Sequence, residues 1–359
     1  MDIDRLSRQL RQLENSAPTS HAYREKAIAL LRKSLPFQAA CCTAVDPLTL
    51  LSIGALTEEG IEAIHDQLFR LEYHIAQHDF NRLPTLMHSD QPAASLFEAT
   101  GGQPERSERY RDVLQPAGFA DELRAALVSD GACWGFLMLF RRNGHPRFHQ
   151  DEAAAIARIA PVLGETLRKF TLALPDDHES LEGDADSTGI LILSQQLRQL
   201  SCNAAAADLL PQLRQWEHIQ GDAWPRPIRA VAAMALAGKA DNSSARQAQV
   251  CMRTPRGAYL SLQASRLING TGAIEVAVLL EQARPAHMLP LIARAYGLTE
   301  REVEVMKQVF QGQSTKDIAV GLHLSPYTVQ DHLKSIFHKT KVNSRRELVR
   351  QLLTRFIRQ

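Results

Sequence analysis

The stretch STKDIAVGLHLSPYTVQDHLKSIFHKT, residues 314–340, holds two helical patterns with only a brief connection between them. Ser314 and Asp317 form an S-x-x-D pattern, in which a hydroxyl and a carboxylate satisfy free amides at a helix start. Ser325 followed by Pro326 marks a second start, because proline at the first helical position has no amide hydrogen bond to lose. Two helices joined so closely must cross at a steep angle, so the stretch predicts a helix-turn-helix.

Two further helix starts flank this pair. Thr299 and Glu302 form a T-x-x-E pattern, and Ser344 and Glu347 form an S-x-x-E pattern. Apolar residues between the starts keep helical spacing, so we expect four short helices around one small core. One side of the third helix lacks apolar residues and is therefore expected to face solvent, free to enter a DNA major groove. This side carries Tyr327, Gln330, Asp331, Lys334, Ser335 and His338.

The charge of the chain is unevenly divided. Residues 296–359 hold 11 Lys and Arg against 6 Asp and Glu, whereas the preceding 295 residues hold 30 against 34. The net charge of +1 therefore conceals a basic tail on a mildly acidic body. An anionic partner would meet the tail.

Residues 297–349 resemble the DNA-binding domain of LuxR-type transcriptional regulators almost from end to end. In that family the third helix reads the major groove and the fourth helps to form a dimer, so the resemblance implies double-stranded DNA and a second copy of the chain as partners. The matching positions include Leu298, Thr299, the run 301–305, Gly312, Ile318, Ala319, Ser325, Thr328, Val329, His332, Leu333, Ile336, Lys339, Val342, Ser344, Arg345, Glu347 and Leu348.

The resemblance also implies roles for single residues. Gln330, Asp331 and Lys334 are expected to face the groove, and the remaining cations to contact phosphates, which fix position without reading sequence. The alternative is that these charges form an ordinary solvated face. The expected DNA-binding set is Lys316, Ser325, Tyr327, Thr328, Gln330, Asp331, Lys334, Ser335, His338, Lys339, Lys341, Arg345 and Arg346.

Three positions depart from the commoner family pattern: Gln330, Asp331 and Thr340. Gln can bond adenine through two atoms and Asp can accept from cytosine N4, but Asp331 would repel a nearby phosphate. The fold prediction does not depend on these positions, whereas the DNA sequence that the domain would recognise cannot be predicted.

The chain is expected to be a multidomain α+β protein with three units. An acidic, Gly- and Ser-containing seam at 175–188 and a proline-containing seam at 281–290 divide it into residues 1–174, 188–283 and 286–359.

The first unit resembles GAF-type sensor domains, and the middle unit resembles a PAS-like fold. The GAF resemblance rests on AVDPLTLLSIGAL, on the helix leading to HDFNRL, and on the region up to CWGFLMLFRR, where Asp130–Gly131 predicts a hairpin turn. The PAS resemblance rests on GILIL, on LSCNAAAADLL with Asn203 as helix cap, and on three closing strands. Both folds can hold a small molecule between sheet and helices, but the sequence names no ligand or cofactor.

The front of the chain shows no catalytic or metal-binding constellation, so we expect no enzyme. Cys133, Trp134 and Phe136 are interpreted as core residues of a strand. Charged residues near the expected pocket, such as Arg109 and Glu122, are interpreted as an exposed ion-pair set.

Five cysteines without paired spacing favour a reducing compartment, and no run of 18 apolar residues suggests a membrane span, so a cytoplasmic protein is expected. Two alternatives stay open. One is a small-molecule-binding signalling enzyme whose tail is a protein-interaction module. The other is a regulator with collapsed pockets that responds only to a protein partner.

Overall fold

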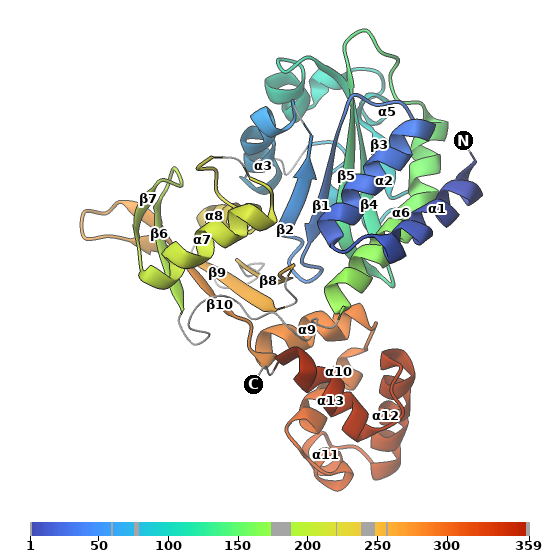
Figure 1. Cartoon of the computed structure of the whole chain (residues 1–359), viewed down its shortest axis with the longest axis vertical. Coiled ribbons are helices and arrows are strands. Elements are labelled where there is room, and N and C mark those ends of the chain that lie inside the picture. The colour runs from blue at the N-terminus through green and yellow to red at the C-terminus, as the bar shows by residue number, and fades with distance from the viewer. Residues whose placement is uncertain are drawn as a thin grey trace.

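The computed structural model shows two antiparallel sheets with their covering helices, followed by a C-terminal group of helices (Figure 1). The acidic seam expected at 175–188 falls almost wholly outside the described residues. Those described are 2–58, 60–74, 79–173, 188–219, 221–237, 248–255 and 258–356.

The first sheet has the strand order β2-β1-β5-β4-β3 among the described residues. The expected hairpin turn is confirmed, since Asp130 and Gly131 take φ values of 51° and 71° between β4 and β5. Trp134 is 1% exposed and Cys133 is buried, which confirms the core interpretation of this strand. The strands are β1 (Ala39–Val45), β2 (Ser52–Thr57), β3 (Ala93–Ser95), β4 (Phe119–Ser129) and β5 (Ala132–Arg142).

Two long helices, α2 (Ser20–Ser34) and α6 (Gln150–Leu172), cover one face of this sheet, and α1 (Ile3–Ser16) packs on these two helices. Leu6 and Leu10 anchor α1, because the same face of an amphipathic helix recurs every three to four residues. Shorter elements lie between the strands in sequence. They are α3 (His65–His74), α4 (Leu83–Leu86), α5 (Leu96–Ala99), the 3₁₀ turns Glu62–Ile64 and Pro104–Arg106, and the π turn Tyr110–Leu114.

The second sheet repeats the strand order of the first. Its order is β7-β6-β10-β9-β8, which becomes 2-1-5-4-3 when its strands are numbered from one, as in the first sheet. Alternate residues of β10 are buried, so one face packs against helices and the other meets solvent. Asn203 caps α7 as expected. The elements are β6 (Gly189–Ser194), β7 (Gln199–Cys202), α7 (Ala204–Trp216), α8 (Arg226–Ala237), β8 (Gln249–Arg253), β9 (Tyr259–Ile268) and β10 (Ile274–Gln282).

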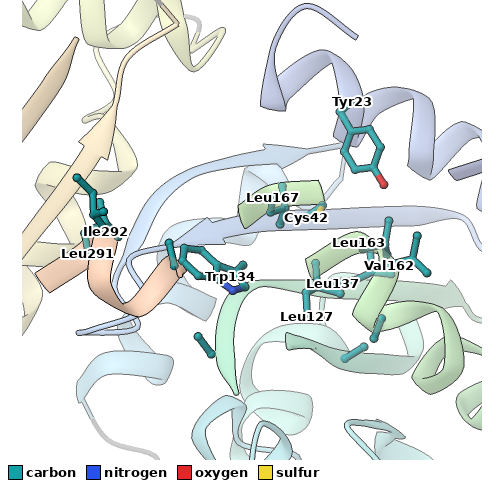
Figure 2. Packing of buried hydrophobic residues seen from close by; sticks show 14 of the residues in the cluster. Tyr23, Cys42, Leu127, Trp134, Leu137, Val162, Leu163, Leu167, Leu291 and Ile292 are labelled. Atoms are coloured by element: carbon teal, nitrogen blue, oxygen red, sulfur yellow. The ribbon is translucent and has the colours of Figure 1, made fainter. Parts of the chain in front are cut away.

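The second expected seam, residues 281–290, covers the end of β10, a short link and the start of α9 (Pro285–Ala295). Proline at the first helical position costs no hydrogen bond, so Pro285 starts the helix rather than breaking the chain. Leu291 and Ile292 of α9 belong to the same buried cluster as Trp134 of β5 (Figure 2).

Four helices follow α9 in the described chain, as the cap patterns predict. Among the described residues, none of the helices is long and apolar enough to cross a bilayer. Four of the five cysteines are buried, and all five are free thiols. The C-terminal helices are α10 (Glu300–Phe310), α11 (Thr315–Gly321), α12 (Pro326–Thr340) and α13 (Arg345–Phe356).

Candidate nucleic-acid interface

The helix-turn-helix is formed by α11, a tight turn and α12. Ser314 and Asp317 make the expected reciprocal cap at the start of α11, and Ser325 caps α12 with Pro326 at its first position. His323 takes a left-handed conformation, φ 54°, in the turn between them. A non-glycine residue in this region reverses the chain at a small strain cost, so the two helices need only a few linking residues.

Glu302 fixes α12 against α10. Its carboxylate accepts a hydrogen bond from the Thr299 amide at 2.7 Å, from Ser335 Oγ at 2.5 Å and from Lys339 Nζ at 2.7 Å. Burial alone would raise the pKa of Glu302, but these donors outweigh it and lower the pKa to about 2. The charged carboxylate therefore joins the start of one helix to the side of another.

The outward side of α12 is exposed where the sequence predicts it. Tyr327 is 84% exposed, and Gln330, Asp331, Lys334 and His338 are exposed along the same helix. α12 packs closely against α10, α11 and α13. In Figure 1 these helices lie below α9, away from both sheets.

Asp331 and Lys334 pair with each other on this side. Lys334 Nζ lies 3.3 Å from Asp331 Oδ1, and both side chains are 75% exposed. A pair this exposed contributes little to stability and opens readily. Either side chain is therefore available to a partner in the groove.

Several expected site residues have partners inside the domain. Ser335 and Lys339 bind Glu302, and Lys339 also donates to the Gly297 carbonyl at 3.1 Å. Arg345 donates to the carbonyls of Val309 and Gln313. These side chains hold the helices together, whatever else they contact.

The remaining expected residues divide into two groups. The Ser325 and Thr328 hydroxyls lie 2.9 Å apart at the start of α12, where Ser325 also accepts from the Thr328 amide. Lys316, Lys341 and Arg346 are exposed cations at the start of α11, the end of α12 and the start of α13. Sequence reasoning found these cations but missed the role of Glu302. The T-x-x-E pattern reveals its cap bond and gives no sign of the contacts to α12.

The front of the chain differs from one expectation. The charged network around Arg109 is buried rather than exposed, which corrects the ion-pair interpretation. Arg109 pairs with Glu122 at 2.9 Å and with Asp79 at 3.2 Å, and Arg124 pairs with Glu122 at 3.0 Å. Two arginines sharing one carboxylate compensate its desolvation, so burial is tolerated.

This network lies beside a small cavity on the first sheet. The cavity has a volume of about 60 Å³, and its lining includes Cys41, His65, Glu122 and Arg124. His65 Nδ1 is buried and has no hydrogen-bond partner among the described residues. In the described part of the chain, no group of three or more His, Cys, Asp or Glu side chains is placed to hold a metal ion.

Comparisons with known proteins find matches for the C-terminal helices. Residues 297–352 match the family model GerE, "Bacterial regulatory proteins, luxR family". The chain is also similar to the nitrate/nitrite response regulator protein NarP of Escherichia coli strain K12, with 44% identity over 48 residues. That alignment covers 13% of this chain and 22% of NarP, so the chain spans about a fifth of the length of this relative. The C-terminal helices therefore form a LuxR-type DNA-binding domain.

Similarities to solved structures are distant. The Vibrio cholerae VqmA dimer structure aligns at 17% identity and a TM-score of 0.20, covering 47% of this chain and 83% of that one. The E. coli DhaR(N)–DhaL complex aligns at 12% identity and a TM-score of 0.25, covering 79% of this chain and 90% of that one. Scores this low do not identify the fold of either front unit.

Proposed function

We propose that the protein is a DNA-binding transcriptional regulator whose outward side of α12 enters the major groove. The observation that carries this proposal is the exposure of Gln330, Asp331 and Lys334 on one uncovered side of a helix that its neighbours hold rigidly. The family match over residues 297–352 supports the same reading.

The geometry refines the roles proposed for the DNA-binding residues. Gln330, Asp331 and Lys334 face base edges, together with Tyr327 and His338 on the same side. Arg345 holds α13 against the end of α10. Side chains with internal partners position α12, namely Ser325, Thr328, Ser335 and Lys339. The exposed cations contact phosphates, namely Lys316, Lys341 and Arg346.

The two sheet units act as the sensor in this proposal. The first is a GAF-like domain and the second a PAS-like domain, and their shared strand order and helical cover support this assignment. A small molecule or partner acting on them controls DNA binding through α9, which links β10 to α10 and packs against α6 and β8. The protein acts in the cytoplasm. It binds DNA as a homodimer, because one helix-turn-helix reads only a short half-site.

Selection of bound duplexes from a random pool by the full chain tests DNA recognition. We expect enrichment of a two-fold symmetric sequence. Repeating the selection with cell extract tests whether a signal alters the amount of duplex recovered. Lys334→Ala should weaken binding to the selected duplex about tenfold. Lys307→Ala removes the same charge from an exposed position on α10 and should have little effect. Equal losses of DNA affinity in both variants would mean that only net charge matters for binding. A selection that enriches no duplex would contradict the proposal.

A further inference from the structure

A second, larger cavity lies where the two sheet units meet. Its volume is about 400 Å³, and it is lined by α2, α6, β2 and β5 of the first unit and by the end of α7 and β8 of the second. Small-molecule sites range from roughly 300 to 1,000 Å³, so this cavity is large enough for a ligand and the 60 Å³ cavity of the first sheet is not.

Two polar groups in this cavity lack partners. Arg24 is 6% exposed, and its Nη1 donates to the Cys42 carbonyl at 2.9 Å and to the Gly54 carbonyl at 3.0 Å, while Nε donates to the Ser20 carbonyl at 3.2 Å. Its Nη2 makes no hydrogen bond within the described chain. Thr254 is 1% exposed, and its Oγ1 has no partner among the described residues. Buried polar groups are nearly always satisfied, so Thr254 Oγ1 points to a ligand, and Arg24 supplies a further donor on the cavity wall.

The electrostatics of the cavity wall favour an anion. Arg24 bonds only to neutral carbonyls and has no ion-pair partner among the described residues. Glu217 also lines the cavity, but it accepts from the Arg226 amide at 2.9 Å and pairs with Arg226 Nη1 at 3.3 Å. Burial raises the pKa of Glu217 to about 7, so its negative charge is reduced near neutral pH. The pKa of His21 is lowered to about 4 by burial and by the nearby positive groups of Arg24, His218 and Arg226.

Aromatic rings form the remaining wall. Trp134, Phe170 and Trp216 line the cavity. The rings of His21 and His218 also line it, with centroids 4.2 Å apart and planes tilted by 36°. Flat faces of this kind pack against a planar apolar body and contribute beyond simple area burial.

We infer that the cavity between the two sheet units binds a small organic carboxylate with a planar apolar body. The Nη2 group of Arg24 donates to the carboxylate, the Thr254 hydroxyl supplies a second hydrogen bond, and the rings enclose the body. The inference rests on the proposed sensing function and names its site and ligand class. An occupant touches both α6 and β8, and these two elements contact α9, so binding is coupled to the placement of the DNA-binding domain.

Calorimetric titration of the full chain tests the inference, with phenylacetate and its neutral analogue phenylacetamide as probes. A ligand of this size binds in the low millimolar range or tighter, so phenylacetate should give saturable heat by about 10 mM. Phenylacetamide should bind roughly tenfold more weakly, because it loses the charge-assisted hydrogen bond to Arg24.

Two matched variants locate the site. Thr254→Val should weaken phenylacetate binding about fivefold while leaving the melting temperature unchanged, since the hydroxyl has no partner to lose. Thr43→Val makes the same change in the first-sheet cavity and should leave binding unchanged. Equal affinity for acid and amide, no heat by about 10 mM, or a loss in Thr43→Val instead of Thr254→Val would overturn the inference. The titration needs no DNA, so its failure leaves the proposed DNA binding standing.

Discussion

Arg294 of α9 donates a hydrogen bond from Nη2 to the carbonyl oxygen of Gly131, 2.6 Å away, at the tip of the β4–β5 hairpin. Arg168 of α6 reaches the same region, donating from Nη1 to the Ala295 carbonyl at 2.8 Å and lying 3.3 Å from Asp130. The C-terminal end of α9, which leads into the DNA-binding domain, is therefore bonded to the tip of the β4–β5 hairpin of the first sheet.

Removing the Arg294 contact should release α9 while leaving the sheets folded. Arg294→Ala loses a charge-assisted hydrogen bond, so amides of α9 and of the hairpin turn should exchange about tenfold faster. Hydrogen exchange followed by mass spectrometry of the full chain measures this. Arg284→Ala is the control, because the Arg284 side chain is 72% exposed and, within the described part of the chain, bonds only to the nearby Glu281. Identical exchange in both variants would show that apolar packing alone holds α9.

Glu302 should control how firmly α12 is held. Glu302→Gln keeps the shape but loses the charge that Lys339 and the Thr299 amide bind, so local unfolding of α10 and α12 should become easier by about 2 kcal/mol. Glu304→Gln removes the same charge from an exposed position and is the control. Amide exchange in α12 measures the difference.

The pH dependence of this contribution has a defined sign. The pKa of Glu302 is lowered from 4.5 to about 2, so its contribution to stability is complete above pH 4.5 and is lost as pH falls through 2. The difference between wild type and Glu302→Gln should therefore be constant from pH 5 to 7 and shrink below pH 4.5. A difference that stays constant at low pH would show that the charge is not what holds α12.

The C-terminal helices could be predicted because their signals are local. Caps such as Thr299 and Ser325 act over three residues, and the structure has them where the sequence places them. The packing of α9 depends on distant residues, since Leu291 and Ile292 share a buried cluster with Trp134 of β5. Such packing offsets the helix-breaking tendency of Pro290 inside α9, which local signals alone would not predict.

The buried charges could not be predicted, since burial depends on distant partners. Arg109 becomes buried because Asp79 and Glu122, 30 and 13 residues away, both reach it. The link from Glu302 to Ser335 likewise spans 33 residues. At the candidate site, helical spacing therefore predicts the outward direction of Gln330 and Lys334. It does not reveal that the Lys339 ammonium already donates a hydrogen bond to Glu302 within the domain.

Asp46 should make the junction of the sheet units sensitive to pH. Its Oδ2 accepts from the Cys251 amide at 2.8 Å, across the two units, and burial raises its pKa from 3.8 to about 6. Because the folded chain binds the proton more tightly, the contribution of Asp46 to stability falls as pH rises from about 4 to about 6 and is constant above.

Urea unfolding of the full chain at several pH values tests this dependence. Between about pH 4 and about pH 6, the free energy of unfolding of the wild type should fall by up to about 1.4 kcal/mol per pH unit because of Asp46, and Asp46→Asn should remove this slope. Asp222→Asn changes an exposed carboxylate of the second unit and should leave the slope as in wild type. Equal slopes in wild type and Asp46→Asn would mean that Asp46 titrates normally.

Asp331 should restrain non-specific DNA binding. Its carboxylate pairs with Lys334 at 3.3 Å and lies on the side of α12 proposed to enter the groove, where it repels phosphates. Asp331→Asn removes that repulsion and frees the Lys334 ammonium, so affinity for a duplex of unselected sequence should rise roughly three- to tenfold at moderate salt. The slope of log affinity against log salt should steepen by about one, because one more counterion is released. Fluorescence anisotropy over a salt series measures both quantities. Glu300→Gln makes the same charge change at an exposed position at the start of α10, so an equal gain there would assign the effect to net charge rather than to the Asp331–Lys334 pair.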